Sequence, residues 1–151
     1  MEKPLPLITS DNAPFWEGCR NGQLLLQRCT ACAAWRYPPA PVCPRCASTV
    51  AAWTPTSHSG RIHSFVIYRR AFHPAYATEV PYAVALVELD EGMRMLFRIV
   101  DCPLETLTIG ARGEIRFMRL TDEVTLPVFA PHPQQPLFHE HPVSTKRRVT
   151  Q

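Results

Sequence analysis

Two pairs of cysteines with the same internal spacing form the strongest chemical motif in the chain. Cys29 and Cys32 make the first pair, and Cys43 and Cys46 make the second. A gap of two residues lets both thiolates of a pair point at one ion while the backbone turns beneath them. Two such pairs complete a tetrahedral site with Zn–S distances of about 2.3 Å. We therefore predict that the four cysteines bind one zinc ion.

Other chemistry is compatible with paired cysteines. A single Cys-x-x-Cys motif also occurs in redox proteins, and the four residues together admit two disulfides or an iron site of the rubredoxin type. The double motif at this spacing favours zinc. Four thiolates leave no open coordination position, so we expect the ion to support the structure and not to activate water.

The remaining nucleophiles and bases do not form a convincing catalytic set. The spare cysteines are Cys19 and Cys102, and packing is the favoured interpretation for both because free cysteine is among the most buried residue types. The histidines are His58, His63, His73, His132, His139 and His141. His73 is the one to test first, although an ordinary exposed loop histidine is the favoured interpretation. We expect no catalysis by this chain on its own.

Composition limits the class of protein. The 151 residues, 46% of them hydrophobic, suffice for one ordinary domain or for two small units that share a core. The 16 prolines argue against long helices and favour strands and turns. The formal net charge is +3, and Lys146, Arg147 and Arg148 account for all of it. The body of the protein is therefore roughly neutral, unlike a typical nucleic-acid binder.

Apolar runs are too short for a membrane span, which needs about 20 residues, and residues 1–14 lack the apolar run of a signal peptide. We expect a soluble, cytoplasmic protein that does not associate with a membrane. A reducing compartment favours metal binding over disulfides for paired cysteines.

The motifs divide the chain into four parts. These are an N-terminal helical segment (1–28), the zinc ribbon (29–49), a barrel (50–131) and a proline-rich, basic tail (132–151). The tail is expected to be extended, and either flexible or docked on a partner.

A short helix is predicted in the first part. Ser10 or Asp11 can cap it, with Pro14 in its first turn. Its aromatic pair, Phe15 and Trp16, has two interpretations. Core packing is favoured, and docking of an exposed aromatic helix on a partner stays open.

Strands dominate the third part. Apolar and alternating runs predict five strands, over residues 61–69, 81–90, 93–100, 114–120 and 126–129. Residues 70–80 form a long loop after the first strand, and Glu91-Gly92 makes a hairpin turn. Five short strands without a long helix favour a small barrel of the OB-fold type. The expected fold is mainly β: a short helix, a rubredoxin-like zinc ribbon, a five-stranded OB-fold barrel and an extended C-terminal tail.

Several motifs together resemble a known family. Besides the two cysteine pairs they include residues 14–17, 22–24, 37–39, 81–82, 87–92 and 109–110. Over about residues 10–131 the chain is similar to zinc-ribbon plus OB-fold proteins associated with acyl-CoA metabolism. The zinc ribbon is the specific part of this match.

This resemblance implies a non-catalytic accessory subunit. Members of the family accompany thiolase-like enzymes, including degradative thiolases, retro-aldolases of steroid side-chain breakdown and complexes that make acetoacetyl- or hydroxymethylglutaryl-CoA. The catalytic residues then lie on the partner. The resemblance also implies a CoA thioester of a fatty, aromatic or steroid acid as ligand of the complex, and a two-plus-two assembly with the thiolase-like partner.

The predicted loop after the first barrel strand carries side chains that suit a CoA thioester. The phosphates of a CoA thioester bind to cationic side chains, and its adenine packs on an aromatic or aliphatic surface. The candidate acyl-CoA residues are Arg69, Arg70, Phe72, His73 and Tyr76, with Arg98 on the neighbouring hairpin. The alternative for each residue is a solvated, charged loop.

Two other functions compete with the accessory subunit. Zinc ribbons and OB barrels also bind single-stranded nucleic acid, on aromatic side chains in a positive groove and with strong salt dependence. The neutral body, and the lack of interleaved basic and aromatic positions along a strand pair, count against that function. A self-sufficient small enzyme would need the catalytic set that the sequence lacks. We rank the accessory subunit first and the nucleic-acid module second.

Overall fold

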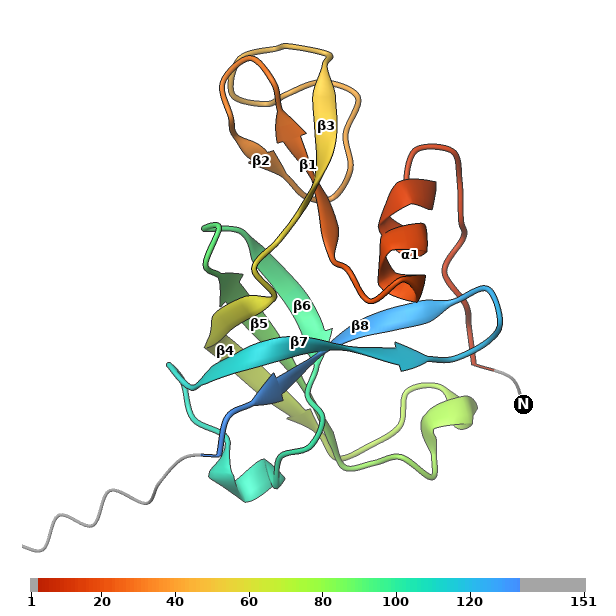
Figure 1. Cartoon of the computed structure of the whole chain (residues 1–151). Helices are drawn as coiled ribbons and strands as arrows, with labels where there is room; N and C mark the ends of the chain where they lie inside the picture. Colours follow the sequence, from red (N-terminus) through yellow and green to blue (C-terminus); the bar gives the residue numbers. More distant parts are fainter. Residues whose placement is uncertain (1–2, 134–151) are drawn as a thin grey trace, which may run out of the picture.

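The computed structural model describes residues 3–133, which form two β-sheets and one short α-helix (Figure 1). The helix, α1 (Ala13–Arg20), has Pro14 in its first turn and buries Phe15 and Cys19 on one face, as predicted. It begins one to two residues later than predicted, because Asn12 stands at the N-cap position. Gly18 is required here, since a Cβ would lie 2.7 Å from the Leu25 side chain.

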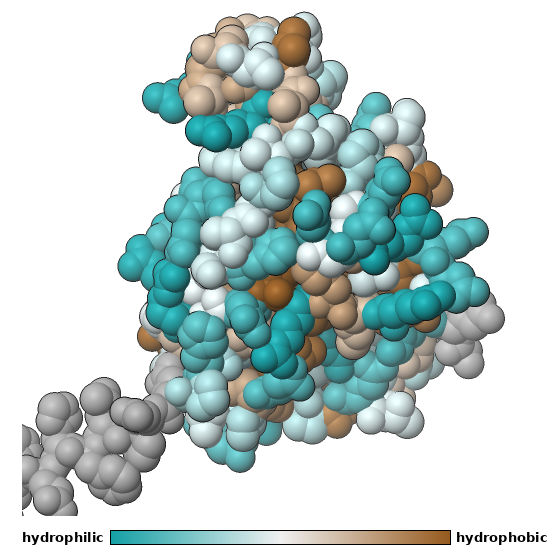
Figure 2. Space-filling view, viewed as in Figure 1, coloured by the Kyte–Doolittle hydropathy of each residue, from teal (hydrophilic) through white to brown (hydrophobic). Residues whose placement is uncertain are grey.

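A small antiparallel sheet holds the cysteine motif. It consists of β1 (Leu25–Cys29), β2 (Trp35–Arg36) and β3 (Ala51–Pro55) in the order β2-β1-β3. Arg36 is buried and ties the surrounding loops together, because its guanidinium donates to the carbonyl oxygens of Ala40 at 3.0 Å and Val50 at 2.9 Å. In the space-filling view this sheet and its loops form a knob above the larger body (Figure 2).

The larger body is a five-stranded sheet that curls nearly closed. Its strands are β4 (Ser59–Tyr68), β5 (Tyr82–Leu89), β6 (Arg94–Arg98), β7 (Arg112–Arg119) and β8 (Thr125–Pro131). They lie in the order β6-β5-β4-β7-β8, and a parallel bridge between Ile99 and Phe129 joins the two ends of the sheet. This order, with a parallel contact between the third and fifth barrel strands, is the OB-fold arrangement.

Alternation along the strands builds the barrel core. Met95, Phe97 and Ile99 point inward and are buried, whereas Arg94 and Leu96 point outward. Gly92 turns the hairpin between β5 and β6 with φ +84°, a conformation that glycine adopts without strain. The short 3₁₀ helices η1 (Pro74–Tyr76) and η2 (Leu104–Thr106) interrupt the loops after β4 and β6.

The expected fold class is confirmed: residues 3–133 are mainly β, with one short α-helix, an N-terminal ribbon and a nearly closed five-stranded barrel. The five predicted barrel strands are all present, with bounds shifted by a few residues. The boundaries proposed between the four parts stay a prediction, and the tail lies outside the described residues except for its first two positions. Among residues 3–133, no helix is both long and apolar enough to cross a membrane.

Candidate functional site

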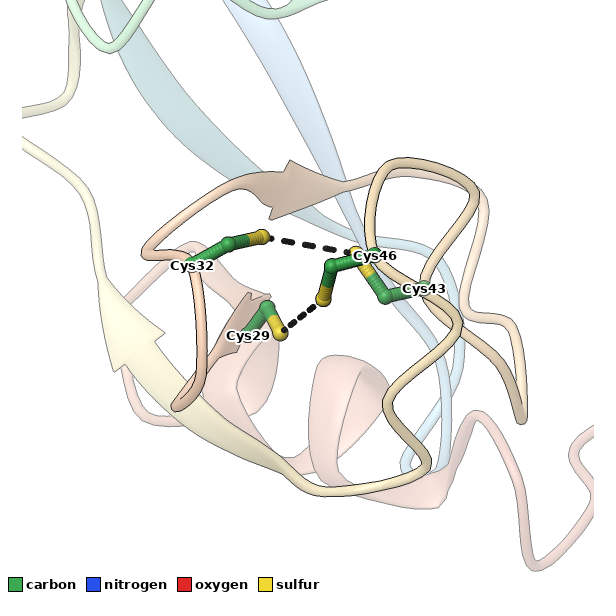
Figure 3. A group of neighbouring side chains, drawn as sticks. All are labelled: Cys29, Cys32, Cys43 and Cys46. Atoms are coloured by element: carbon green, nitrogen blue, oxygen red, sulfur yellow. Dashed lines mark hydrogen bonds between the residues drawn. The ribbon is translucent and has the colours of Figure 1, made fainter.

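The two cysteine pairs sit on two backbone turns of the same geometry. In the first, the carbonyl of Cys29 accepts from the N–H of Ala33 at 2.9 Å, and Ala33 has φ +58°. In the second, the carbonyl of Cys43 accepts from the N–H of Ala47 at 2.9 Å, and Ala47 has φ +60°. Each turn folds the chain back under its two thiols, so all four sulfur atoms converge (Figure 3).

The sulfur positions fit a tetrahedral metal centre. The Sγ atoms of Cys29 and Cys46 lie 3.6 Å apart, those of Cys32 and Cys43 lie 3.7 Å apart, and all four lie within 4.8 Å of one another. Tetrahedral ligands at a Zn–S distance of about 2.3 Å would be separated by about 3.8 Å. A disulfide requires about 2.05 Å. The geometry therefore favours metal ligation over the disulfide alternative, and all six thiols are free.

Backbone amides supply part of the electrostatics of this centre. The N–H of Cys32 is the main cause that lowers the pKa of Cys29 to about 5, and the N–H of Arg45 lowers the pKa of Cys43. For Cys46 the N–H of Ser48 lowers the pKa, but the three neighbouring sulfur atoms and burial outweigh it and raise that pKa to about 12. Four thiolates held this close need a cation between them. A bound zinc would have four sulfur ligands and no open position, which suits a structural role.

Residues 69–81, which join β4 to β5 and carry most of the candidate acyl-CoA residues, form a loop beside a stack of aromatic rings, and we call it the aromatic loop. Tyr68 at the end of β4 and Tyr82 at the start of β5 stack with ring centroids 5.0 Å apart. Phe72 meets Tyr68 edge-on at 6.1 Å and is 83% exposed. Tyr76 lies 6.1 Å from Tyr82. The sequence did not identify Tyr68 and Tyr82 as site residues. They become neighbours only through the antiparallel register of β4 and β5, so only an alignment of these two strands could have found them.

The cations of this loop differ in their surroundings. Arg69 and Arg70 are exposed, and the structure of residues 3–133 gives neither side chain a hydrogen bond or an ion pair. Arg98 instead forms an ion pair with Glu79 and lies 5.0 Å from the centroid of the Tyr82 ring. Glu79 also pairs with Lys3, a contact that no local pattern predicted.

His73 has a structural contact of its own. Its Nδ1 accepts a hydrogen bond from the N–H of Ala75 at 3.2 Å and so caps η1. Its ring meets Tyr76 edge-on at 6.2 Å. The structure therefore brings all six candidate acyl-CoA residues to one region, with Arg69 and Arg70 as its unpaired cations and Phe72 as its most exposed ring.

The two candidate partner residues on α1 differ in exposure. Phe15 is buried in the hydrophobic core, which agrees with the favoured interpretation that it packs there. Trp16 is half-buried and meets Phe15 edge-on at 5.0 Å. Trp16 also lines a surface cavity of about 320 Å³ with Glu17, Arg20 and Glu123. The prediction of a partner contact on this helix therefore depends on Trp16.

The spare cysteines lack the surroundings of a nucleophile. Cys19 is fully buried, and desolvation raises the pKa of its thiol to about 12. Cys102 is half-buried, and its Sγ lies 3.3 Å from the hydroxyl of Thr106. Within residues 3–133, neither thiol has a hydrogen bond to a histidine. In this part of the chain, neither spare cysteine therefore forms a thiol–histidine pair of the kind that activates a nucleophile.

Family comparisons match both halves of the chain. Residues 16–51 match the model described as the ChsH2 rubredoxin-like zinc ribbon domain, and residues 53–118 match the ChsH2 C-terminal OB-fold domain. The two matches together span the cysteine centre, the aromatic loop and most of the barrel.

Curated relatives fall into two groups. The chain is 37% identical over 129 residues to a "Probable enoyl-CoA hydratase alpha subunit" of Thermomonospora curvata, covering 85% of this chain and 40% of that protein. It is 36% identical over 105 residues to the 3-oxo-4,17-pregnadiene-20-carboxyl-CoA hydratase alpha subunit of Mycobacterium tuberculosis, covering 70% of this chain and 33% of that protein. The chain thus spans well under half the length of these relatives. A DUF35 domain-containing scaffold protein of Methanocaldococcus jannaschii is 30% identical over 97 residues, 64% of this chain and 68% of the relative.

Solved structures support the same fold. A chain of the structure named "Ltp2-ChsH2(DUF35) aldolase" matches with a TM-score of 0.77 and 37% identity, over 84% of this chain and 98% of that chain. A DUF35 protein of unknown function from Sulfolobus solfataricus has a TM-score of 0.57 at 12% identity, over 82% of this chain and 86% of that one, which is a likeness of fold alone.

Proposed function

Because the chain belongs to the DUF35 family and carries both ChsH2-type domains, the zinc ribbon and the OB fold, we propose that it is a non-catalytic accessory subunit of an acyl-CoA enzyme. Its partner is a thiolase-like protein, and the reaction is a thiolase or retro-aldolase step in the degradation of a fatty, aromatic or steroid acyl-CoA. The chain braces the partner and helps to form the acyl-CoA site.

One similarity carries this proposal. The match covers 98% of the chain from the Ltp2-ChsH2(DUF35) aldolase at 37% identity, so nearly all of that chain has a counterpart in this one. That aldolase is named for two components, Ltp2 and ChsH2, and the ChsH2 domains are the ones that this chain shares. The hydratase subunits are weaker guides, because the chain covers only 40% and 33% of their lengths.

The cysteines of the chain have surroundings that agree with a non-catalytic, supporting role. A zinc held by Cys29, Cys32, Cys43 and Cys46 would be closed to substrate, since it has four sulfur ligands. Cys19 is buried with a raised pKa, and Cys102 has no histidine partner within residues 3–133. The groups that make or break the carbon–carbon bond therefore belong to the partner.

The aromatic loop is the part of the chain that we assign to the acyl-CoA. Arg69 and Arg70 have no competing carboxylate in the described structure and can bind phosphate groups. Phe72, 83% exposed, offers its ring to the adenine. Arg98 is paired with Glu79 and lies over Tyr82, so it positions the aromatic stack. His73 and Tyr76 hold the short helix η1 that shapes the loop.

The test of this site compares two double variants in the assembled complex. Arg69→Ala with Arg70→Ala removes the unpaired cations, and Arg45→Ala with Arg119→Ala removes two exposed arginines elsewhere. Loss of two charge-assisted contacts at an exposed site should weaken acyl-CoA binding about tenfold. The control pair should leave the dissociation constant unchanged. Equal affinities of the two double variants would remove Arg69 and Arg70 from the site.

Assembly and location complete the proposal. Thiolase-like partners are usually dimers, so a two-plus-two complex follows, which light scattering of the co-purified subunits would measure. The cytoplasm suits a centre of four reduced thiols. Failure of the chain to bind any thiolase-like protein encoded beside it would contradict the accessory function.

Nucleic-acid binding remains the second candidate because of one observation. The stacked rings of Tyr68 and Tyr82 lie beside Arg69, Arg70 and Arg98, which combines aromatic and basic groups at one end of an OB barrel. Single-stranded binding on such a surface would weaken steeply with salt. Titration with a fluorescent oligothymidine at two salt concentrations discriminates the candidates, since the accessory subunit is expected to give no salt-dependent signal.

A further inference from the structure

The outer face of the β4–β5–β6 part of the barrel carries apolar side chains where solvent-facing strands usually carry polar ones. The register places Val66 beside Val84 and Leu86 beside Leu96, all on the face opposite the core. Val66 is 48% exposed and Leu96 is 68% exposed. We call these four residues the apolar strip. The helix α1 does not cover it, because α1 packs against β1, β7 and β8 (Figure 1).

Both ends of the apolar strip carry more cations than carboxylates. At one end the single carboxylate of Glu88 accepts from both Arg61, at 2.5 Å, and Arg94, at 2.9 Å. At the other end the single carboxylate of Glu79 is shared by Lys3 and Arg98. Each end therefore keeps one positive charge in excess, in a chain whose body is otherwise nearly neutral.

The strip also runs into the aromatic loop. Next along the register after Val66 and Val84 come Tyr68 and Tyr82, which stack and begin and end the loop that holds Arg69 and Arg70. Whatever covers the strip therefore comes to lie beside the loop. Sites for small molecules are concave, whereas this is the open face of a sheet, so its occupant is a macromolecule.

The geometry points to a docking surface for the catalytic partner: a protein whose contact area is apolar in the middle and rich in aspartate and glutamate at its rim. This inference rests on the accessory function proposed above and names the face used. Apolar contact at the centre excludes water and supplies affinity, and the excess cations at the two ends steer an acidic rim into register. A partner seated here shares the loop of Arg69 and Arg70, so one acyl-CoA could contact both subunits.

The decisive variant is Leu96→Glu, which places a charge in the middle of the strip. Its matched control is Ile109→Glu, since Ile109 is 71% exposed but lies in the loop before β7. Both side chains point to solvent, so both variants should fold, and equal zinc content and equal melting temperatures would check this. Binding of the purified thiolase-like subunit encoded beside the chain is followed by surface plasmon resonance. Leu96→Glu should weaken it at least about tenfold through faster dissociation, while Ile109→Glu leaves it unchanged.

The rim is tested by Arg61→Glu with Arg94→Glu. This pair should slow association several-fold at low salt, and the difference from the unmodified chain should shrink as salt is added. Unchanged kinetics for Leu96→Glu beside normal binding of the unmodified chain would overturn the docking surface and leave the accessory function standing. Absence of binding by the unmodified chain would overturn both. Loss of oligothymidine binding in the arginine pair, with the partner still bound normally, would assign the face to nucleic acid instead.

Discussion

His58 accepts a hydrogen bond through its Nε2 from the backbone N–H of Leu24, at 3.1 Å, although the two residues lie 34 positions apart. Leu24 directly precedes β1 of the ribbon, and His58 directly precedes β4 of the barrel. A second bond, from the N–H of Thr56 to the carbonyl of Leu24 at 3.0 Å, lies beside it. The His58 ring also packs edge-on against Phe117 of β7, at 5.5 Å. These contacts join the ribbon to the barrel.

Replacement of His58 should therefore loosen this joint. Asparagine tolerates the observed φ of +61°, so His58→Asn fits the backbone. It removes the imidazole whose Nε2 accepts the hydrogen bond from the N–H of Leu24. A part-buried N–H left without its partner costs about 1–3 kcal/mol. Urea unfolding should show that loss in the free energy of unfolding. The control His63→Asn, at an exposed position of β4, should change it by less than about 0.5 kcal/mol. Equal effects of the two variants would contradict the joint.

Local patterns explain which parts of the fold could be predicted. The spacing of Cys29 and Cys32 brings their two thiols together because the turn between them is local, and the strand over residues 93–100 follows from the two-residue alternation of its side chains. Both features depend on a few consecutive residues, and both were predicted. The start of α1 was misplaced by one or two residues, because residues 9–12 form a turn before the helix in which the side chain of Asn12 accepts from the N–H of Thr9.

Contacts between distant residues could not be read from such patterns. Glu79 meets Lys3 and Arg98 only because the barrel has closed and the loop after β4 has folded back. The composition of the aromatic loop was predicted, but the stack of Tyr68 on Tyr82 depends on the register of two strands. The apolar strip was missed for the same reason, because its four residues come from three strands.

Thiol labelling should divide the six cysteines into three classes. In the zinc-loaded protein the four ligand cysteines are protected by the metal, and Cys19 is protected by burial and by its pKa of about 12. Cys102 is half-buried and free of metal and disulfide partners, so Ellman's reagent should label about one thiol per chain. Cys102→Ser should abolish this signal. Fast labelling of Cys19 in the folded chain would contradict the buried position.

Removal of a metal ligand should affect the ribbon more than the barrel. Cys43→Ser should lower the zinc content from about one ion per chain to nearly none, since the remaining three thiolates hold the metal weakly. Hydrogen exchange should then rise in β1, β2 and β3, while β5 and β6 keep their protection because most residues of the hydrophobic core belong to the barrel. The control Cys102→Ser should keep the full zinc content. Full zinc occupancy in Cys43→Ser would contradict the four-sulfur site.

Acid should selectively weaken the loop that Glu79 holds. Hydrogen bonds from Lys3 and then Arg98 keep the pKa of Glu79 below its ordinary value of 4.5 in the folded protein. A carboxylate with a lowered folded pKa stabilises the protein above its unfolded pKa, and that stabilisation is lost as the pH falls through the folded value. Water screens these partly exposed pairs, so Glu79→Gln should cost about 1 kcal/mol at pH 7.

The difference between the unmodified chain and Glu79→Gln should therefore be full at pH 7 and vanish well below pH 4.5, where both carry a neutral side chain at this position. Urea unfolding at a series of pH values measures it. Glu105→Gln is the matched control, because Glu105 is exposed on η2 and has no ion pair in the described structure, so its effect should be small at every pH. A Glu79→Gln difference that stays constant from neutral to acid pH would show that its charge does not hold the loop.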